Sequence, residues 1–279
     1  AIPSIRGKYR SRRMEDIVKE ARWLAENGVT ELVVVAQDTT RYGEDIYGKS
    51  MLPELLTALC EIDGFKWIRT LYCYPERITD ELLDVIAKED KLVKYLDMPI
   101  QHCDKTILKR MNRHGDRETL TALIKKIREK IPNVTLRTTL ITGFPGETEE
   151  QFEELCEFVK EIRFERLGCF AYSPEEGTPA EKFEDQVPLK DRERRAEIIM
   201  EEQMIISDSL NEAALDSEVE VVCEGFDRYA ECYYGRSQAD APEIDGKIFF
   251  LSEDKVRVGE YVKVKIDDTM DYDLIGSKM

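Results

Sequence analysis

The apolar positions between residues 14 and 171 alternate between two spacings along the chain. Apolar side chains three or four residues apart predict helices over 14–25, 53–62, 79–88, 105–111, 117–130 and 148–162. Short apolar runs between them predict strands over 31–36, 67–72, 94–98, 134–142 and 165–171. Strands that are each separated by a helix predict a parallel sheet with right-handed crossovers. We therefore expect an α/β fold, as a partial (β/α) barrel or an open sheet.

The first predicted element is a helix, although a parallel βα series normally begins with a strand. We therefore expect the first strand and its loop to precede Ala1. The last predicted helix of the series opens with the capping box Thr148-x-x-Gln151, and its apolar stripe is expected to be buried. That stripe consists of Phe152, Leu155, Cys156, Val159 and Ile162. These features define a first domain over residues 1–174.

The pattern changes after Pro174. Residues 175–190 are rich in Glu, Pro and Gly and are predicted to form a loop, and a long charged helix is expected from Arg192 to about Ala214. From residue 218 the apolar period becomes two, and five short runs are broken by Gly, Asp and Pro. We expect a connecting loop and helix over 175–211 and a small antiparallel β-barrel domain over 212–279.

The charge of the chain is concentrated near its C-terminus. The 279 residues include 41 Lys and Arg and 58 Asp and Glu, for a formal net charge of −17. Residues 212–279 hold 17 acidic and 8 basic side chains, a net of −9. Binding to nucleic acid phosphates depends on Lys and Arg, so this acidity argues against such a role and favours a basic partner.

The cysteines and apolar runs restrict the class of protein. The seven cysteines are an odd number, with no C-x-x-C pair and no His at metal spacing, which argues against a disulfide framework or zinc site. A reducing cytosol is the expected compartment. Apolar runs such as 32–36 are of strand length, far below the roughly 18 residues that a transmembrane helix needs.

Polar residues follow three of the predicted strands, over 37–43, 99–103 and 142–148. The carboxyl ends of parallel strands form the functional surface of α/β folds, so these segments predict a site for a polar small molecule. Gly143 and Gly146 would let the backbone approach such a ligand closely. The alternative is that any β–α turn favours Gly and Pro, which the third segment alone does not exclude.

The chain has few residues suited to acid–base or nucleophilic catalysis. His102 and Cys103 are adjacent and should point apart on a strand end, so we expect His102 to make an ordinary hydrogen bond. The sequence has only two His and lacks the G-x-S-x-G, P-loop and H-E-x-x-H motifs. These absences indicate either a binding scaffold or an enzyme whose chemistry belongs to a cofactor.

Six segments resemble, in order, the radical S-adenosylmethionine (SAM) methylthiotransferase family. They are AIPSIRGKYRSR, QDTTRYG, YLDMPIQH, RTTLITGFPGETEEQF, FAYSPEEGTPA and GRSQADAPEIDG. The segments at 240–246 and 271–276 are nearer to members that modify an aspartate of a ribosomal protein than to those that modify transfer RNA. The resemblance implies a partial radical-SAM barrel that lacks its first strand, followed by a TRAM domain.

The resemblance also implies cofactors, partners and site residues. The cofactors are SAM and two [4Fe-4S] clusters, and the reaction is methylthiolation of the β-carbon of an aspartate in the twelfth small-subunit ribosomal protein. SAM is expected to contact Gln37, Asp38, Gln101, Arg137, Thr139, Gly143, Phe144, Pro145 and Gly146. The basic ribosomal protein is expected to dock on the acidic TRAM domain, with Asp240, Glu243 and Asp245 as substrate-binding residues.

The family's cluster-binding cysteine motif would end just before Ala1, and no cysteine of this chain matches it. We therefore expect this polypeptide to bind neither cluster and to be inactive by itself, while a longer parent protein carries the activity in the cytoplasm. Two alternatives stay open: a transfer-RNA adenosine methylthiotransferase, and a non-catalytic module that docks the ribosomal protein.

Overall fold

The computed structural model describes residues 7–279, so the first six residues of the segment AIPSIRGKYRSR lie outside the described residues. The chain divides into two compact units, Ala1–Glu202 and Gln203–Met279. Of the helices within residues 7–279, none combines the length and the apolar character that a transmembrane span requires.

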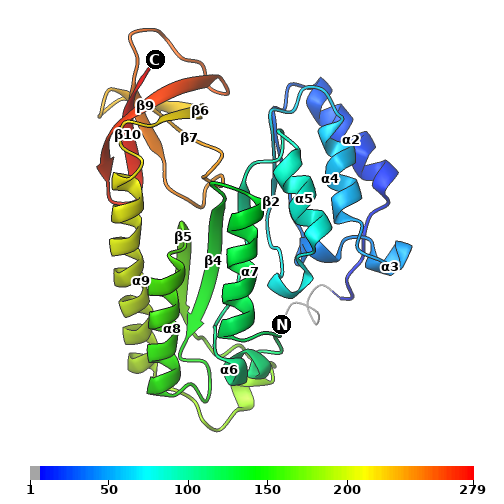
Figure 1. The fold of residues 1–279 in the computed structure, drawn as a ribbon, viewed down its shortest axis with the longest axis vertical. Helices are drawn as coiled ribbons and strands as arrows, with labels where there is room; N and C mark the ends of the chain where they lie inside the picture. Colours follow the sequence, from blue (N-terminus) through cyan, green and yellow to red (C-terminus); the bar gives the residue numbers. More distant parts are fainter. Residues whose placement is uncertain (1–6) are drawn as a thin grey trace. The chain divides into compact units, whose positions relative to one another are not determined.

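The first unit is a series of parallel strands separated by helices (Figure 1). The strands are β1 (Glu31–Val34), β2 (Trp67–Thr70), β3 (Tyr95–Asp97), β4 (Thr135–Thr142) and β5 (Arg166–Ala171). The helices are α2 (Met14–Glu26), α3 (Glu44–Tyr47), α4 (Leu52–Cys60), α5 (Asp80–Lys88), α6 (Lys105–Arg110), α7 (Arg117–Lys130) and α8 (Glu149–Ile162). Short 3-10 turns are η1 (Thr39–Arg41), η2 (Pro75–Arg77) and η3 (Ala180–Lys182). Every predicted helix and strand of this region is present.

The parallel strands pair in two sheets, β1–β2 and β3–β4–β5, rather than in one regular sheet. The N–H of Ile68 donates to the carbonyl oxygen of Lys91 at 2.7 Å, and the N–H of Val93 donates to that of Ile68 at 3.1 Å. Strand β2 is therefore hydrogen-bonded to the residues just before β3 rather than to β3 itself. The two strands are only four and three residues long. The strand order still follows the chain order, as a partial (β/α) barrel requires.

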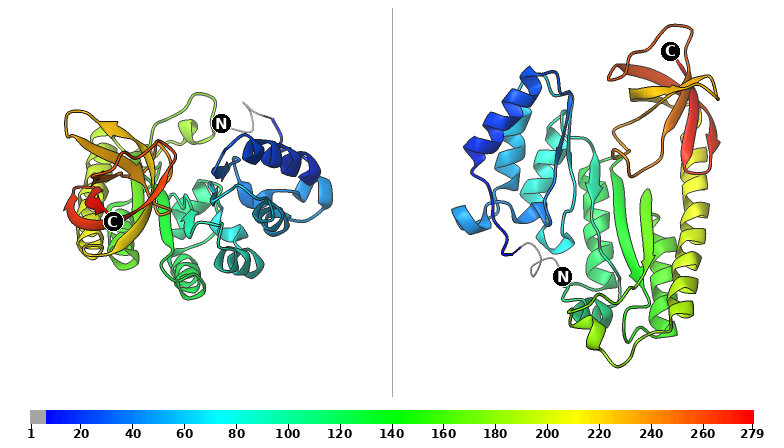
Figure 2. Two further views of the ribbon diagram at one scale, coloured as in Figure 1. Left: turned by 90° about the horizontal axis from the view of Figure 1, so that it is seen from above. Right: turned by 180° about the vertical axis from the view of Figure 1, so that it is seen from behind.

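Side chains of β4 alternate between two environments. Leu136, Thr138, Leu140 and Thr142 are buried, whereas Arg137, Thr139 and Ile141 are half-buried. Helices α7 and α8 run alongside this strand (Figures 1 and 2). Because successive side chains of a strand point to opposite faces, the helices cover one face, and the half-buried residues lie on the other.

Helix α8 shows how local sequence and packing agree. Thr148 accepts a hydrogen bond from the Gln151 N–H at 3.3 Å, and the Gln151 side chain accepts one from the Thr148 N–H at 3.0 Å, so the predicted capping box is present. One detail of the predicted stripe was wrong. Phe158 is fully buried, whereas Cys156 is only half-buried.

The long helix α9 (Leu189–Glu212) begins earlier and ends earlier than the predicted 192–214. Its 24 residues span the division between the two units. Ile199 and Ile206 are buried, and Ile205 is exposed, so only part of its apolar sequence contributes to packing.

The second unit contains a closed five-stranded barrel. Its strands are β6 (Glu218–Asp227), β7 (Cys232–Arg236), β8 (Ile248–Leu251), β9 (Tyr261–Met270) and β10 (Asp273–Lys278), in the order β10-β8-β7-β6-β9. The expected small antiparallel barrel is present, and within it one pair of strands, β8 and β10, runs parallel. Strand directions cannot alternate all the way round a closed ring of five, so one parallel pair is unavoidable. Buried side chains fill the interior, including Val221, Ile248, Phe250, Val264 and Ile266.

Candidate functional site at the carboxyl ends of the strands

Asp38 is the first polar side chain after β1 that is buried. Its Oδ1 accepts a hydrogen bond from the Thr40 hydroxyl, and its Oδ2 lies 3.5 Å from the Arg77 Nε. Burial, the largest influence, raises the pKa of Asp38, while Thr40 and Arg77 oppose that rise. Gln37, the other predicted residue of this segment, is exposed.

Asp97, which the sequence did not single out, joins the ends of β2 and β3 to the third residue of β4. Its side chain is 2% exposed, and it accepts hydrogen bonds from Arg137 Nη1 at 2.8 Å and from the Tyr72 N–H at 3.0 Å. Its carbonyl oxygen also accepts from the Cys73 N–H at 2.8 Å. Arg137, a predicted site residue, is thereby held in a fixed orientation on the half-buried face of β4. An acidic residue in an otherwise apolar strand was the signal available in the sequence.

Gln101 adopts the left-handed backbone conformation, with φ of 71°. Its N–H donates to the Thr139 carbonyl at 2.9 Å, and its carbonyl oxygen accepts from the Ile141 N–H at 2.8 Å. These two bonds extend the β3–β4 pairing beyond β3, and they hold a backbone conformation that non-glycine residues rarely adopt. Gln101 and Thr139, both predicted site residues, are therefore brought together.

The loop Gly143–Glu147, here called the glycine loop, follows β4 directly. Gly143 and Gly146 have φ of 68° and 84°, which favours glycine at both positions. A Cβ at Gly143 would lie 2.9 Å from the Arg192 Cα, and one at Gly146 would lie 2.6 Å from an Asp185 carboxylate oxygen. Close packing against other parts of the chain therefore accounts for both glycines.

The apolar residues of the glycine loop are also enclosed. Phe144 and Pro145 are buried, and the Phe144 ring lies edge-to-face with Tyr172 and Phe183, at centroid distances of 5.1 and 6.3 Å. The segment that follows β5 thus covers one side of the loop. This packing was not predicted, because Phe183 lies in a stretch whose composition indicates only a loop.

The buried His102 makes an ordinary hydrogen bond, in which its Nδ1 accepts from the Asp104 N–H at 2.9 Å. Burial is the largest influence on Cys103 and raises the pKa of its thiol. A buried thiol with a raised pKa is a poor nucleophile, so the two residues do not form a catalytic pair.

The three residues expected to bind substrate lie in one turn of the second unit. Asp240 is 2% exposed and accepts hydrogen bonds from the Ser237 N–H and hydroxyl at 3.1 and 2.8 Å. The half-buried Asp245 accepts one from the Ala241 N–H at 2.8 Å. Glu243 is exposed, with φ of 61°. Two of these carboxylates thus hold the turn, and one faces solvent.

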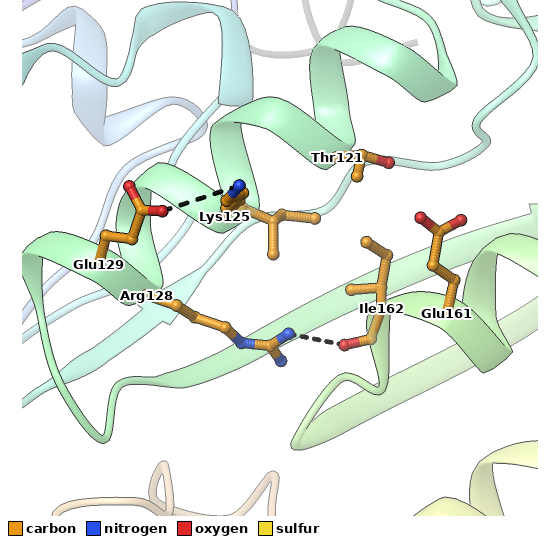
Figure 3. Close-up of a pocket in the computed structure, with 7 residues that line it drawn as sticks. Thr121, Lys125, Arg128, Glu129, Glu161 and Ile162 are labelled. Carbon is orange, nitrogen blue, oxygen red and sulfur yellow. Dashed lines mark hydrogen bonds and ion pairs between the residues drawn. The ribbon is translucent and has the colours of Figure 1, made fainter.

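A surface pocket of about 350 Å³ lies between α7 and α8 (Figure 3). Lys125, Arg128 and Glu161 are among its lining residues, and Arg128 donates to the Ile162 carbonyl oxygen at 2.7 Å. Helix α8 begins at the carboxyl end of β4, so its last residues lie toward the amino ends of the strands. None of the predicted site residues lines this pocket.

Comparison with known proteins defines the class of this chain. Residues 1–159 match the Radical SAM superfamily, and residues 217–278 match the TRAM domain. The chain therefore belongs to the radical SAM superfamily and carries a TRAM domain. The solved structure of coproporphyrinogen III oxidase (HemN) from Escherichia coli, a radical SAM enzyme, has the same fold, with a TM-score of 0.51 at 21% identity. The superposition covers 72% of this chain and 48% of that one.

Curated relatives are similar over nearly the whole chain. A protein named ribosomal protein uS12 methylthiotransferase RimO from Clostridium tetani is 51% identical over 276 residues, which is 99% of this chain. A protein of the same name from Clostridioides difficile is 52% identical over 275 residues. The chain spans 62% of the length of each of these two relatives.

The radical SAM class uses SAM and an iron–sulfur cluster. Within residues 7–279 no three His, Cys, Asp or Glu side chains converge in a way that could hold a metal ion. The described residues therefore do not provide the ligands of an iron–sulfur cluster.

Replacing Asp97 by Asn should destabilise the first unit. The change removes the charge that pairs with Arg137 while leaving an oxygen that can still accept from Tyr72. Breaking a largely buried pair on one side costs about 3 kcal/mol, so chemical denaturation should show a fall of that size in the free energy of unfolding. Asp90→Asn, at an exposed position, is the matched control. Equal effects of the two changes would contradict the role given to Asp97.

Replacing Asp38 by Asn should change how stability depends on pH. Because the pKa of Asp38 is raised in the folded chain, the folded state holds its proton more tightly than the unfolded state, and ionisation of Asp38 lowers stability as pH rises through that interval. Asp38→Asn should therefore gain stability relative to the unmodified chain as the pH rises above about 4. The measurement is the difference between their free energies of unfolding at each pH. A difference that moves the other way would show that Arg77 outweighs burial.

Proposed function

We propose that the carboxyl ends of β1, β3 and β4 bind SAM, through Gln37, Asp38, Gln101, Arg137, Thr139 and the glycine loop. The chemistry of these donors suits the ligand. The fixed guanidinium of Arg137 is complementary to the carboxylate of SAM, and the buried carboxylate of Asp38 is complementary to its ammonium group or ribose hydroxyls. The amide side chains of Gln37 and Gln101 are complementary to the polar edge of its base. SAM supplies, when bound in a radical SAM enzyme, the means to remove hydrogen from an unactivated carbon.

The residues of this chain would bind and orient the ligand rather than transfer protons. Asp97 fixes Arg137, backbone bonds fix Gln101 and Thr139, and the buried aromatic cluster around Phe144 keeps water from one side of the glycine loop. Preorganised groups of this kind lower the cost of ordering the site when a ligand binds.

We infer that the longer protein to which this chain corresponds methylthiolates the β-carbon of an aspartate in ribosomal protein uS12, using two [4Fe-4S] clusters. The observation that carries this proposal is the identity of about half of all residues, over 99% of the chain, to proteins named for that reaction. The match includes both units. A substrate on the ribosome implies action in the cytoplasm.

The second unit would dock the basic ribosomal protein. Its charge supports this, because residues 212–279 carry a net of −9 and exposed carboxylates occur on several strands and turns, including Glu218, Glu220, Asp267 and Asp268. A strongly acidic surface attracts a basic protein and repels the phosphates of transfer RNA.

Mass spectrometry of a strain that lacks the gene would test the reaction. We expect uS12 to lose the mass of a methylthio group at one aspartate, and transfer RNA adenosines to keep their modification. Expression of the full-length gene should restore the modification of uS12. Normal uS12 together with unmodified transfer RNA would overturn the proposal in favour of a transfer-RNA enzyme.

The change Glu243→Lys should weaken binding of the chain to purified uS12. Glu243 is the exposed carboxylate of the predicted trio, so reversing its charge should reduce affinity about threefold at low salt and have little effect at high salt. Calorimetry at two ionic strengths would measure this. Glu129→Lys, on the exposed surface of α7, makes the same charge change in the first unit and should leave affinity unchanged. Equal losses in both variants would show that only net charge matters.

A further inference from the structure

We infer that Arg195 of helix α9 is a positioning residue that fixes the conformation of the glycine loop. The consequence for SAM rests on the proposed function, whereas the effect on the loop does not. Arg195 lies 48 residues beyond Glu147 in the chain, in a region where the sequence indicates only a charged helix.

The contact is a buried ion pair at the end of the glycine loop. Arg195 Nη1 lies 2.9 Å from Glu147 Oε1, and the two side chains are 6% and 0% exposed. The same nitrogen donates to the Glu147 carbonyl oxygen at 3.2 Å, so Arg195 binds both the side chain and the backbone of this residue. Its Nη2 reaches Glu149 Oε2 at 2.8 Å, at the first turn of α8.

Glu147 transmits this restraint to the start of the loop. Its second oxygen, Oε2, accepts a hydrogen bond from the Gly143 N–H at 2.9 Å. One carboxylate therefore closes the loop on itself and is held in place by Arg195. Hydrogen bonds to an ionised acceptor are among the strongest available, provided that the charge stays compensated.

Two further contacts support the same arrangement. The Thr142 hydroxyl donates to the Arg192 carbonyl oxygen at 3.2 Å, and Arg192 Nη1 donates to the Tyr172 carbonyl oxygen at 2.7 Å. The first turns of α9 are thus bonded to the ends of both β4 and β5. On the other side, His102 Nε2 lies 3.6 Å from Glu147 Oε2, too long for a hydrogen bond but close enough to enclose the carboxylate.

Loss of Arg195 would leave Glu147 as an uncompensated buried charge. The carboxylate would then turn toward water to regain its hydration, and this breaks the bond from the Gly143 N–H. The glycine loop would open more often, and a ligand would have to order it again on binding. Arg195 therefore acts through Glu147 and does not itself contact the ligand.

The matched pair of variants is Arg195→Met and Arg194→Met. Arg194 is the neighbouring arginine of α9, and it also pairs with Glu149, but its side chain is 43% exposed and makes no contact with Glu147. In hydrogen exchange measured by mass spectrometry on the full chain, peptides that cover residues 143–147 should exchange at least tenfold faster in Arg195→Met. Arg194→Met should change that rate less than twofold. Unchanged exchange of the loop in Arg195→Met would overturn the inference.

A second-site change separates positioning from a general loss of stability. In Arg195→Met/Glu147→Gln the neutral amide oxygen can still accept from the Gly143 N–H, and no buried charge is left uncompensated. Slow exchange of the loop should therefore return in the double variant. If Arg195→Met does not fold, Arg195→Gln, which also removes the charge, replaces it, and slow exchange should again return on adding Glu147→Gln. Failure of this rescue would also contradict the inference.

Calorimetric titration with S-adenosylhomocysteine links the loop to the ligand. We expect affinity to fall about tenfold in Arg195→Met and to recover in the double variant. Fast loop exchange with unchanged affinity would confine Arg195 to the loop and show that the loop does not serve the ligand. An unmodified chain that binds no S-adenosylhomocysteine, but whose loop responds as expected, would contradict the proposed SAM site and leave the role of Arg195 supported.

Discussion

The first unit depends on one constraint, the parallel pairing of its strands within the sheets β1–β2 and β3–β4–β5. Each strand must return to the same edge of its sheet, so every loop that follows a strand lies at one edge. The short strands leave few ladder hydrogen bonds to hold that edge. The buried carboxylate of Asp97 compensates, because it ties the end of β2 to β3 and β4 at once.

The sequence predicted the elements of this fold well and the contacts between them poorly. Helices such as α7 and the capping box of α8 were predicted because the signals are local: apolar spacing and a Thr three residues before a Gln. The division into two sheets was not predicted, because β2 and β3 are shorter than the apolar runs 67–72 and 94–98 that predicted them. The parallel pair in the barrel is a consequence of closing five strands into a ring. The sequence of a single strand does not indicate that closure.

Prediction of the candidate site had the same limit. The segments that follow β3 and β4 are joined by the backbone bonds of Gln101, whereas the segment that follows β1 belongs to the other sheet. The partners of their side chains lie too far away in sequence to be inferred, as with Asp97 for Arg137. In the second unit, Asp240 accepts hydrogen bonds from Ser237 of its own turn, whereas Glu243 is exposed. Residue type alone does not distinguish a carboxylate that holds a turn from one that is exposed.

Three largely buried ion pairs of the first unit share one property. Glu31–Arg69, Asp97–Arg137 and Glu147–Arg195 join residues 38, 40 and 48 positions apart, and each connects different elements. Buried pairs contribute little net stability compared with apolar packing, because each charge loses its hydration. Their directional hydrogen bonds instead distinguish one arrangement of elements from its neighbours, which apolar contacts do less well. Two of the three lie at the strand ends where the candidate ligand site is placed. A site that depends on backbone positions at several strand ends requires that these ends be fixed relative to one another. The ion pairs provide that restraint, and they do so at positions that the periodicity of the sequence does not reveal.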